Sequence, residues 1–160
     1  MSTSTKHKSA SSETNDKAAT VQAMEGLLAD SYTLYLKTHG YHWNVTGPMF
    51  STLHTMFETH YTDLALAVDE IAERIRALEA PAPASYSQFL ERAQVEEDRG
   101  VPAALDMIRN LVADHETVAA SARKVVRAAE AAGDDASGDL GVRRIDVHEK
   151  TAWMLRSHLQ

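Results

Sequence analysis

The chain contains no cysteine, which excludes disulfide bonds, thiol nucleophiles and zinc sites built on thiolates. No apolar run approaches the roughly 20 residues of a membrane-spanning helix, so we expect no membrane partner. No alternating segment rich in Val, Ile or Thr predicts a β-strand. The first residues are polar and lack the apolar stretch of a signal peptide, so we expect a cytoplasmic protein.

The acidic charge of the chain is concentrated outside its first residues. The 160 residues carry a formal net charge of −7, and residues 1–20 hold three lysines against two acidic residues, a net of +1. The remainder therefore carries −8. An acidic body disfavours nucleic-acid binding through its surface and attracts cations. The length fits one domain with a sizeable core.

Apolar residues recur at intervals of three and four along most of the chain, which predicts four long helices. We expect them at about 18–44, 49–79, 102–132 and from the turn at 133–135 nearly to the C-terminus. The second connection exceeds twenty residues, and residues 86–95 predict a short helix within it. Residues 1–17 are expected to form a flexible polar tail. Residues 18–160 thus predict an all-α, ferritin-like four-helix bundle with one crossover.

Five side chains that bind metals well lie within 32 residues of one another: His42, His54, Glu58, Asp69 and Glu73. The second and third of these form an i,i+4 pair, as do the last two, so each pair shares one face of a helix. Imidazole combined with several carboxylates is a ligand set that iron favours. The pattern therefore points to a metal site on the second helix and the end of the first.

The spacing of these pairs limits how one ion can be bound. Glu58 and Asp69 are separated by a rise of about 16 Å along one helix, whereas metal–ligand bonds are only about 2 Å long. Either each pair has other partners, or the pairs meet across a two-fold axis between antiparallel copies. The alternative to metal binding is a solvated acidic flank in which Glu58 and Glu73 pair with cations such as Arg74 and Arg76. The Glu-x-x-His step of the usual ferritin-like di-iron site is absent.

Five segments resemble the Dps family, the DNA-binding proteins from starved cells, also called mini-ferritins. They are YHWNVTGPMF at 41–50, the pairs LH at 53–54 and FE at 57–58, VDEIAERI at 68–75 and HEKTAWMLR at 148–156. The resemblance covers about residues 20–160 and implies a hollow homododecamer with a ferroxidase site at each two-fold interface. One subunit would supply His42, His54 and Glu58, and its partner Asp69 and Glu73. Many members have Asp where this chain has Glu58.

The resemblance also implies a function in iron storage and detoxification. Members of that family oxidise Fe(II), commonly preferring hydrogen peroxide to dioxygen, and store the product as a ferric oxide mineral. The implied ferroxidase centre binds two iron ions, and Zn is expected as a substitute ion. Peroxide consumed by pairs of Fe(II) gives little hydroxyl radical, which protects DNA.

Two further features have both a functional and a structural interpretation. Trp43, next to His42, is either an electron relay or an aromatic side chain packed at a dimer interface. Asp134, Asp135 and Asp139 lie where the resemblance implies an acidic pore that admits iron. Gly-Asp-Asp is also favourable turn chemistry, and an Asp before a helix is a good cap.

The N-terminal lysines raise the question of DNA. Lys6, Lys8 and Lys17 offer a modest cationic tail, and twelve displayed copies would multiply weak phosphate contacts. Binding of that kind would place the protein at the nucleoid. The structural interpretation is a solubilising tail. The runner-up function is an architectural DNA-compacting protein with a vestigial metal site.

Overall fold

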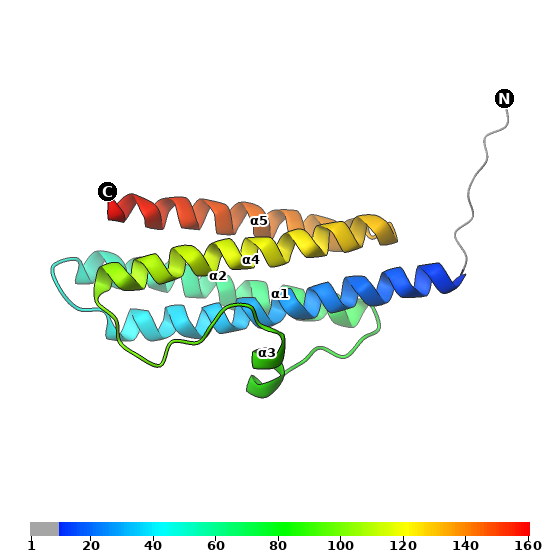
Figure 1. Cartoon of the computed structure of the whole chain (residues 1–160), viewed down its shortest axis with the longest axis horizontal. Helices are drawn as coiled ribbons and strands as arrows, with labels where there is room; N and C mark the ends of the chain where they lie inside the picture. The colour runs from blue at the N-terminus through cyan, green and yellow to red at the C-terminus, as the bar shows by residue number, and fades with distance from the viewer. Residues whose placement is uncertain (1–9) are drawn as a thin grey trace, which may run out of the picture.

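The computed structural model describes residues 10–160, which are almost entirely helical (Figure 1). The elements are α1 (Ala10–Asn44), α2 (Phe50–Ala77), α3 (Tyr86–Arg92), α4 (Ala104–Ala132), α5 (Asp135–Arg156) and the 3-10 helix η1 (Ser157–Leu159). No strand occurs within this range. The predicted all-α class, four long helices and short helix in the second connection are confirmed.

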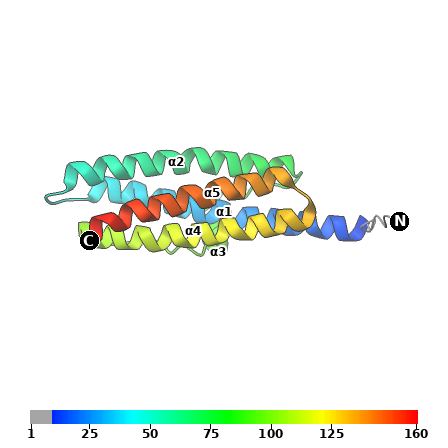
Figure 2. The same cartoon turned by 90° about the horizontal axis from the view of Figure 1, so that it is seen from above.

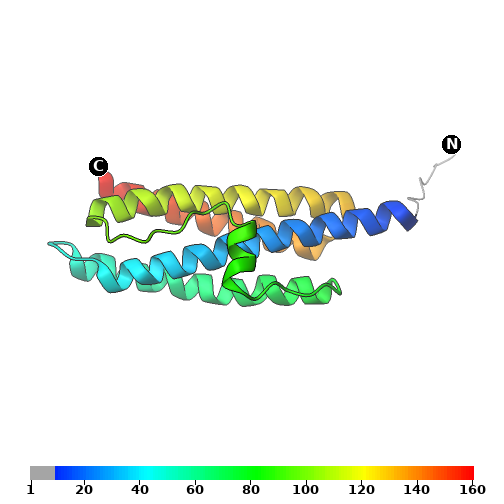
Figure 3. The same cartoon turned by 60° about the horizontal axis from the view of Figure 1, so that its bottom comes forward.

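The four long helices form two antiparallel hairpins that pack side by side. α1 pairs with α2 and α4 pairs with α5, while α1 also packs along α4. The connection from α2 to α4 runs back along the whole bundle, so these two helices point the same way (Figures 1 and 2). The short helix α3 stands across the outside of the bundle and packs on α1 (Figure 3). This is the ferritin-like topology expected from one long crossover.

Apolar side chains from all four long helices fill the space between them. The largest that are almost completely buried are Met24, Leu27, Leu28, Leu34, Leu53, Phe57, Leu64, Ile71, Ile75, Met107, Ile108 and Leu111. Each helix contributes the apolar stripe that its sequence period of three and four predicts, and burial of these stripes drives the helices together.

The first helix begins earlier than the sequence pattern predicts. α1 starts at Ala10, so residues 10–17 are helical and the predicted tail boundary at residue 17 is corrected. Most side chains of residues 11–17 are exposed, and polar composition does not oppose a helix that has no core to face. Glu13 lies in the first turn, where a carboxylate favours the helix dipole. Lys17 reaches Glu79, just beyond α2, with a Nζ–Oε2 distance of 2.6 Å.

A buried carboxylate attaches the crossover to the bundle. Asp30 is completely buried in α1, and its Oδ1 accepts hydrogen bonds from the backbone N–H groups of Gln94 (2.6 Å) and Val95 (2.9 Å). The Ser121 hydroxyl of α4 donates to the other oxygen at 2.5 Å. These three donors offset the desolvation of the carboxylate and join α1, α4 and the crossover at one point.

A second polar cluster holds the end of the crossover. The Tyr41 hydroxyl donates to Asp98 at 2.5 Å and accepts from Asn110 at 3.0 Å. Burial and the bond to Asp98 raise the pKa of Tyr41. Nearby, Lys37 pairs with the buried Asp114 at 2.8 Å, yet burial outweighs the lysine charge and raises the pKa of that carboxyl. The crossover is therefore fixed by polar contacts as well as by packing.

The turn between α4 and α5 depends on backbone conformation and close helix approach. Gly133 ends α4 in the left-handed region (φ 68°), which favours glycine. Asp134 caps α5 by accepting a hydrogen bond from the Ser137 N–H at 3.1 Å. At Gly141 an added Cβ would lie 2.8 Å from Val126 Cγ2, so the small residue permits α4 and α5 to approach closely.

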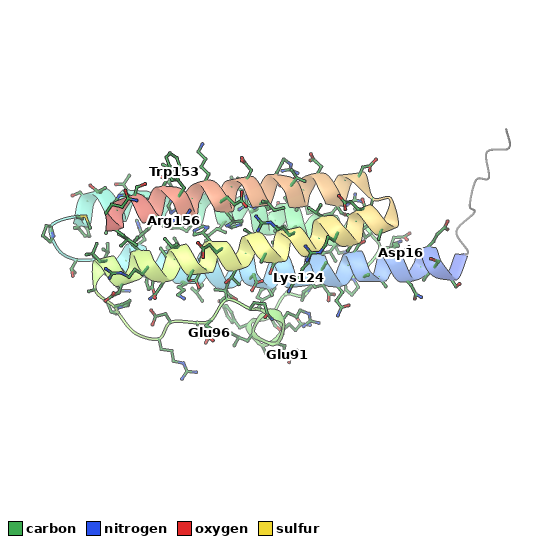
Figure 4. The ribbon with its side chains drawn as sticks, turned by 45° about the horizontal axis from the view of Figure 1, so that its top comes forward. Asp16, Glu91, Glu96, Lys124, Trp153 and Arg156 are labelled. Carbon is green, nitrogen blue, oxygen red and sulfur yellow. The ribbon has the colours of Figure 1, made fainter. Side chains whose placement is uncertain are left out.

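Large apolar side chains are exposed at several places in the described part of the chain, Leu66 of α2 among them, and two of these regions bear on assembly. One lines a groove of about 510 Å³ between α1 and the crossover and includes Leu36, Trp43, Tyr86, Leu90 and Val101. The other is on α5, where Trp153 is 60% exposed and stands off the bundle (Figure 4). Exposed apolar groups of this size indicate contact surfaces. Over residues 10–160, no helix is long and apolar enough to cross a membrane.

Candidate metal centre

Two of the predicted ligands, His42 and His54, face each other where α1 passes into α2. Their rings stack with centroids 3.7 Å apart and planes inclined by 17°. His42 Nδ1 lies 2.7 Å from the carbonyl oxygen of His54, and His54 Nδ1 lies 2.8 Å from the carbonyl oxygen of His42. Because a carbonyl oxygen only accepts, each Nδ1 must carry the proton. In each neutral imidazole, Nε2 then holds the lone pair that a metal requires.

Aromatic rings surround this histidine pair. Phe50 stacks on His54 at 5.0 Å, and the Tyr61 ring lies 5.2 Å from His42. His39 lies between Trp43 and Tyr61, with ring centroids 4.1 Å from each. Burial and the neighbouring His42 lower the pKa of His39. These rings pack around the two imidazoles, whose orientation is fixed by the hydrogen bonds to the backbone carbonyls.

The three predicted carboxylates are exposed on α2 and stay unpaired. Glu58 lies one turn beyond His54, and Asp69 and Glu73 follow further along the same helix. No hydrogen bond or ion pair joins any of the three to another residue in the described part of the chain. Within residues 10–160, no three His, Asp or Glu side chains lie close enough together to hold a metal ion. A single chain therefore brings the two histidines together but leaves Asp69 and Glu73 apart from them.

The cations proposed to neutralise this acidic flank have other partners. Arg74 donates to Asp134 at 2.7 Å and to the Ser137 hydroxyl at 2.9 Å. Arg76 donates to the carbonyl oxygen of Ala80 at 2.8 Å. The alternative in which Arg74 and Arg76 pair with Glu58 and Glu73 is therefore wrong, and these carboxylates remain free to bind a ligand.

The aspartates at the start of α5 differ from one another. Burial alone would raise the pKa of Asp134, but hydrogen bonds from Ser137 and the Arg74 charge outweigh it and keep that pKa below its ordinary value. Asp139 accepts from Arg143 at 3.0 Å, and Asp135 is exposed in the first turn. Asp134 thus has a capping role, and a pore formed by these residues stays a prediction.

The predicted cationic tail is only partly covered by the structure. Lys6 and Lys8 lie outside the described residues. Lys17 is part of α1, where its ammonium is paired with Glu79. One of the three lysines predicted to contact phosphate therefore forms an ion pair within the chain.

The centre of the bundle holds a second histidine group that is completed by an arginine. His115 and His148 are buried, with their Nδ1 atoms 2.8 Å apart, and Arg144 Nη2 lies 3.2 Å from His148 Nε2. Arg144 in turn pairs with Asp63 at 2.9 Å. Burial, with nearby positive charge, lowers the pKa of His115 to about 3 and that of His148 well below its ordinary value. The sequence pattern did not reveal this network, because its members lie far apart along the chain.

Comparison with known proteins assigns the family. The ferritin-like domain family matches residues 21–160. An uncharacterized low temperature-induced protein of Nostoc is 42% identical over 135 residues, which cover 83% of this chain and 75% of that protein. "DNA protection during starvation protein 2" of Bacillus anthracis is 34% identical over 139 residues, or 87% of this chain and 95% of the relative.

Solved structures agree with this assignment. The crystal structure of a Dps protein from Vibrio cholerae, described as a member of a superfamily of ferritin-like diiron-carboxylate proteins, has a TM-score of 0.88 and 35% sequence identity. The match covers 92% of this chain and 92% of that one. Fold and sequence thus agree, and this chain belongs to the Dps family of ferritin-like proteins.

Proposed function

We propose that this protein is a ferroxidase that oxidises Fe(II) and stores the ferric product. The observation that carries the proposal is the reciprocal hydrogen bonding of His42 and His54. It fixes both imidazoles in the tautomer that presents Nε2, and it does so with backbone carbonyls that cannot rotate away. Glu58 stands one turn beyond on the same helix with an unpaired carboxylate. This is a ligand set suited to iron.

The site is completed by a second copy of the chain. Asp69 and Glu73 are exposed and unpaired in the described chain. The helix rise places Asp69 about 16 Å, and Glu73 about 22 Å, from Glu58 of the same chain. An antiparallel α2 from a two-fold partner would bring its Asp69 and Glu73 to His42 and His54. The exposed apolar groove beside Trp43 offers the contact surface that such a dimer needs. In this arrangement Trp43 would become buried at the interface.

The chemistry follows from the ligand types. Two Fe(II) and one hydrogen peroxide, with two protons, give two Fe(III) and two water molecules. Carboxylates stabilise the product Fe(III), the harder ion, while neutral imidazoles hold Fe(II) without adding charge. We expect hydrogen peroxide to be preferred to dioxygen, and Zn(II) to occupy the site without turnover. The ferric product would accumulate as an oxide mineral inside a homododecamer.

Assembly into a closed shell requires more than the two-fold contact. The second exposed apolar region, on α5 around Trp153, lies away from the groove and supplies a further contact surface (Figure 4). Asp135 and Asp139 then remain candidates to line a pore that admits Fe(II). Size-exclusion chromatography with light scattering would measure the expected twelve-subunit mass.

Protection of DNA follows in this proposal from peroxide consumption rather than from compaction. The body of the chain is acidic, and Lys17 is paired with Glu79. A gel-shift assay across salt, with and without residues 1–20, tests the rival architectural function. A shift that is lost with the tail and survives physiological salt would favour that rival.

Replacement of Asp69 and Glu73 by Ala tests the site. Stopped-flow absorbance with Fe(II) and peroxide should lose its fast phase, while the assembled mass remains. Glu130→Ala, which removes an exposed carboxylate from α4, is the matched control and should keep the fast phase. Unchanged kinetics in the double variant would overturn the assignment.

A complementation experiment tests the sharing of the site between subunits. Subunits with His42→Ala and His54→Ala are refolded together with subunits carrying Asp69→Ala and Glu73→Ala. Each variant alone should be inactive, whereas a mixed two-fold pair contains one intact site and should recover part of the rate. Absence of any recovery in proven mixed assemblies would contradict a shared site.

A further inference from the structure

A groove of about 620 Å³ lies between α2 and α5. Its lining includes the exposed Leu66 and the almost completely buried Arg144, so it runs from the surface toward the interior of the bundle. Two ion pairs line this groove, Arg143 with Glu70 and Arg144 with Asp63. The Arg143 side chain is half-exposed, whereas that of Arg144 is only 6% exposed. A cation that enters the groove from solution therefore meets a buried positive charge at its inner end.

Side chains of the kind that bind metals converge on the bundle centre from three helices. They are His60 and Asp63 of α2, His115 of α4 and His148 of α5. The ring centroid of His115 lies 5.1 Å from that of His148 and 6.0 Å from that of His60. Nδ1 of His60 is buried and has no hydrogen-bond partner among the described residues. Ferritin-like di-iron proteins bind their metals with inward-facing carboxylates and histidines of the bundle helices, which is the type of side chain gathered here.

Arg144 contacts two of these side chains as a metal ion would. Its Nη2 lies 2.9 Å from Asp63 Oδ2 and its Nη1 lies 3.4 Å from Oδ1, so the guanidinium spans both carboxylate oxygens. The same Nη2 lies 3.2 Å from His148 Nε2 and takes up the lone pair of that nitrogen. A guanidinium is not deprotonated in proteins, so the bundle centre keeps this positive charge at any pH.

We propose that the guanidinium of Arg144 takes the place of a divalent cation at the bundle centre and excludes Fe(II) from the interior of each subunit. Its consequence rests on the proposed ferroxidase function, because iron that cannot enter the bundle is left to the site shared between subunits. Two physical effects produce the exclusion. Arg144 occupies the lone pairs of Asp63 and His148, and its charge repels a divalent ion at close range. Arg144 thus determines where this protein binds iron.

Calorimetric titration with Zn(II) tests the exclusion without any turnover of iron. All variants carry His42→Ala and His54→Ala, so that metal held at the α1–α2 turn does not enter the count. In this parent, Arg144→Ala should bind one additional Zn(II) for each chain of the assembled protein. Arg143→Ala, which removes the neighbouring half-exposed arginine, is the matched control and should bind no more Zn(II) than the parent. Equal Zn(II) stoichiometry in the two arginine variants would overturn the proposal.

A further substitution locates the additional ion. Asp63→Asn, combined with Arg144→Ala, removes the charge of one ligand at nearly unchanged size and should abolish the additional binding. Arg144→Lys keeps a positive charge at the inner end of the groove and should gain no Zn(II). Additional binding that persists in the Asp63→Asn variant, or that Arg144→Lys gains as fully as Arg144→Ala, would contradict a cation place held by Arg144.

A second neutral variant covers a loss of folding in Arg144→Ala. Arg144→Met fills more of the buried space with an uncharged side chain, and circular dichroism establishes that a variant is folded. Folded Arg144→Met should also gain one Zn(II) for each chain, and its melting temperature should rise when Zn(II) is added. A folded Arg144→Met protein with the Zn(II) stoichiometry of its parent would count against the proposal as strongly as the same result in Arg144→Ala.

Stopped-flow absorbance with His42 and His54 intact tests the consequence for iron. With two Fe(II) for each shared site and hydrogen peroxide, Arg144→Ala should show a smaller fast phase than the wild type, because part of the iron is held at the bundle centre. Arg143→Ala should match the wild type. An undiminished fast phase in an Arg144→Ala protein that gains Zn(II) would refute the exclusion of iron. Absence of a fast phase in the wild type would refute the proposed function, and the Zn(II) titration would then decide the role of Arg144 by itself.

Discussion

His42 and His54 at the α1–α2 turn, and His115 and His148 at the bundle centre, are two contacting histidine pairs with opposite use of their nitrogens. In the first pair each Nδ1 donates to the carbonyl oxygen of the other residue, which leaves both Nε2 lone pairs outside the pair. In the second pair the two Nδ1 atoms face each other. The histidines at the α1–α2 turn thus keep one nitrogen free of contacts within the pair, whereas those at the bundle centre use their nitrogens in contacts that belong to the fold.

Arg144 determines which nitrogens of the buried pair His115 and His148 carry protons. Arg144 can only donate, so His148 Nε2 accepts and His148 Nδ1 carries the proton that it donates to His115. The proton of His115 then sits on Nε2, which is buried without a partner among the described residues. Neither ring keeps an accessible lone pair. Availability for a metal therefore depends on what contacts the other nitrogen, not on the presence of two histidines.

Removal of a buried histidine should produce the largest effect. His148→Ala leaves a cavity and takes the acceptor from Arg144 and the donor from His115, and we expect a loss of about 2–5 kcal/mol in the free energy of unfolding. Denaturant unfolding at fixed subunit concentration measures it. The assembled His148→Ala protein should still oxidise iron, because the substitution lies away from the α1–α2 turn. The control His158→Ala, which removes one exposed hydrogen bond to Met154, should cost under about 1 kcal/mol. Equal effects of the two variants would contradict a special role for the buried pair.

A substitution in the pair at the α1–α2 turn should lower the rate of iron oxidation and the affinity for metal, rather than the free energy of unfolding. His54→Gln retains an amide that can donate to the carbonyl of His42 but has no imidazole lone pair. We expect the rate of Fe(II) oxidation and the affinity for Zn(II) to fall by at least about 100-fold, because loss of a ligand should exceed the effect of losing a supporting contact. Stopped-flow absorbance and calorimetric titration measure the two quantities. His158→Gln is the matched control, and unchanged Zn(II) affinity in His54→Gln would remove this pair from the site.

The buried pair should also give the fold an acid limit. Burial lowers the pKa values of His115 and His148. Below about pH 6.5 the unfolded chain therefore binds protons at these histidines, whereas the folded chain does not. Their contribution is complete above about pH 6.5 and is lost as the pH falls below it, by up to about 1.4 kcal/mol per pH unit for each histidine. For His115 the loss continues to a pH of about 3. Unfolding at successive pH values measures the slope. A free energy that stays flat from pH 6.5 to 5 would contradict it.

Helix positions were predictable because burial imposes a local period. The apolar residues of α2 and α4 recur at three and four, and both helices lie within a few residues of their predicted ranges. The start of α1 was not predictable from that signal, because residues 11–17 are mostly exposed and carry no apolar stripe. The hydrogen bonds that attach the crossover to the bundle could not be predicted for another reason. Asp30 meets its partners 64 to 91 residues away in sequence.

Sequence spacing anticipated the contact between His42 and His54 but not the protonation of their nitrogens, and the full ligand set stays a prediction. Residue type and spacing named His42 and His54, and the helix rise separated Glu58 from Asp69. Sequence spacing does not say which imidazole nitrogen is protonated, because the carbonyl that decides it belongs to a residue twelve positions away across a turn. Nor does it reveal that Arg74 is bound to Asp134.

The smallest effect on iron oxidation is expected for Glu58→Asp, which keeps the carboxylate and shortens the side chain by one methylene. Glu58 is exposed and unpaired in the described chain, so Glu58→Asp should change the free energy of unfolding by less than about 0.5 kcal/mol. The carboxylate withdraws by one methylene while both Nε2 lone pairs remain. We therefore expect iron oxidation to change by less than about tenfold, or about 1.4 kcal/mol in barrier. Glu58→Gln, which removes the charge at equal length, should lower the rate further.

Comparison of Asp and Gln at this position in stopped-flow oxidation separates reach from charge. A ligand bound mainly through its charge tolerates Asp and not Gln, whereas one whose position is critical tolerates neither. If Glu58→Asp were as damaging as His54→Gln, the carboxylate would be as closely positioned as the imidazoles. The rigid carbonyl-locked pair would then no longer be the feature that distinguishes the α1–α2 turn from the bundle centre.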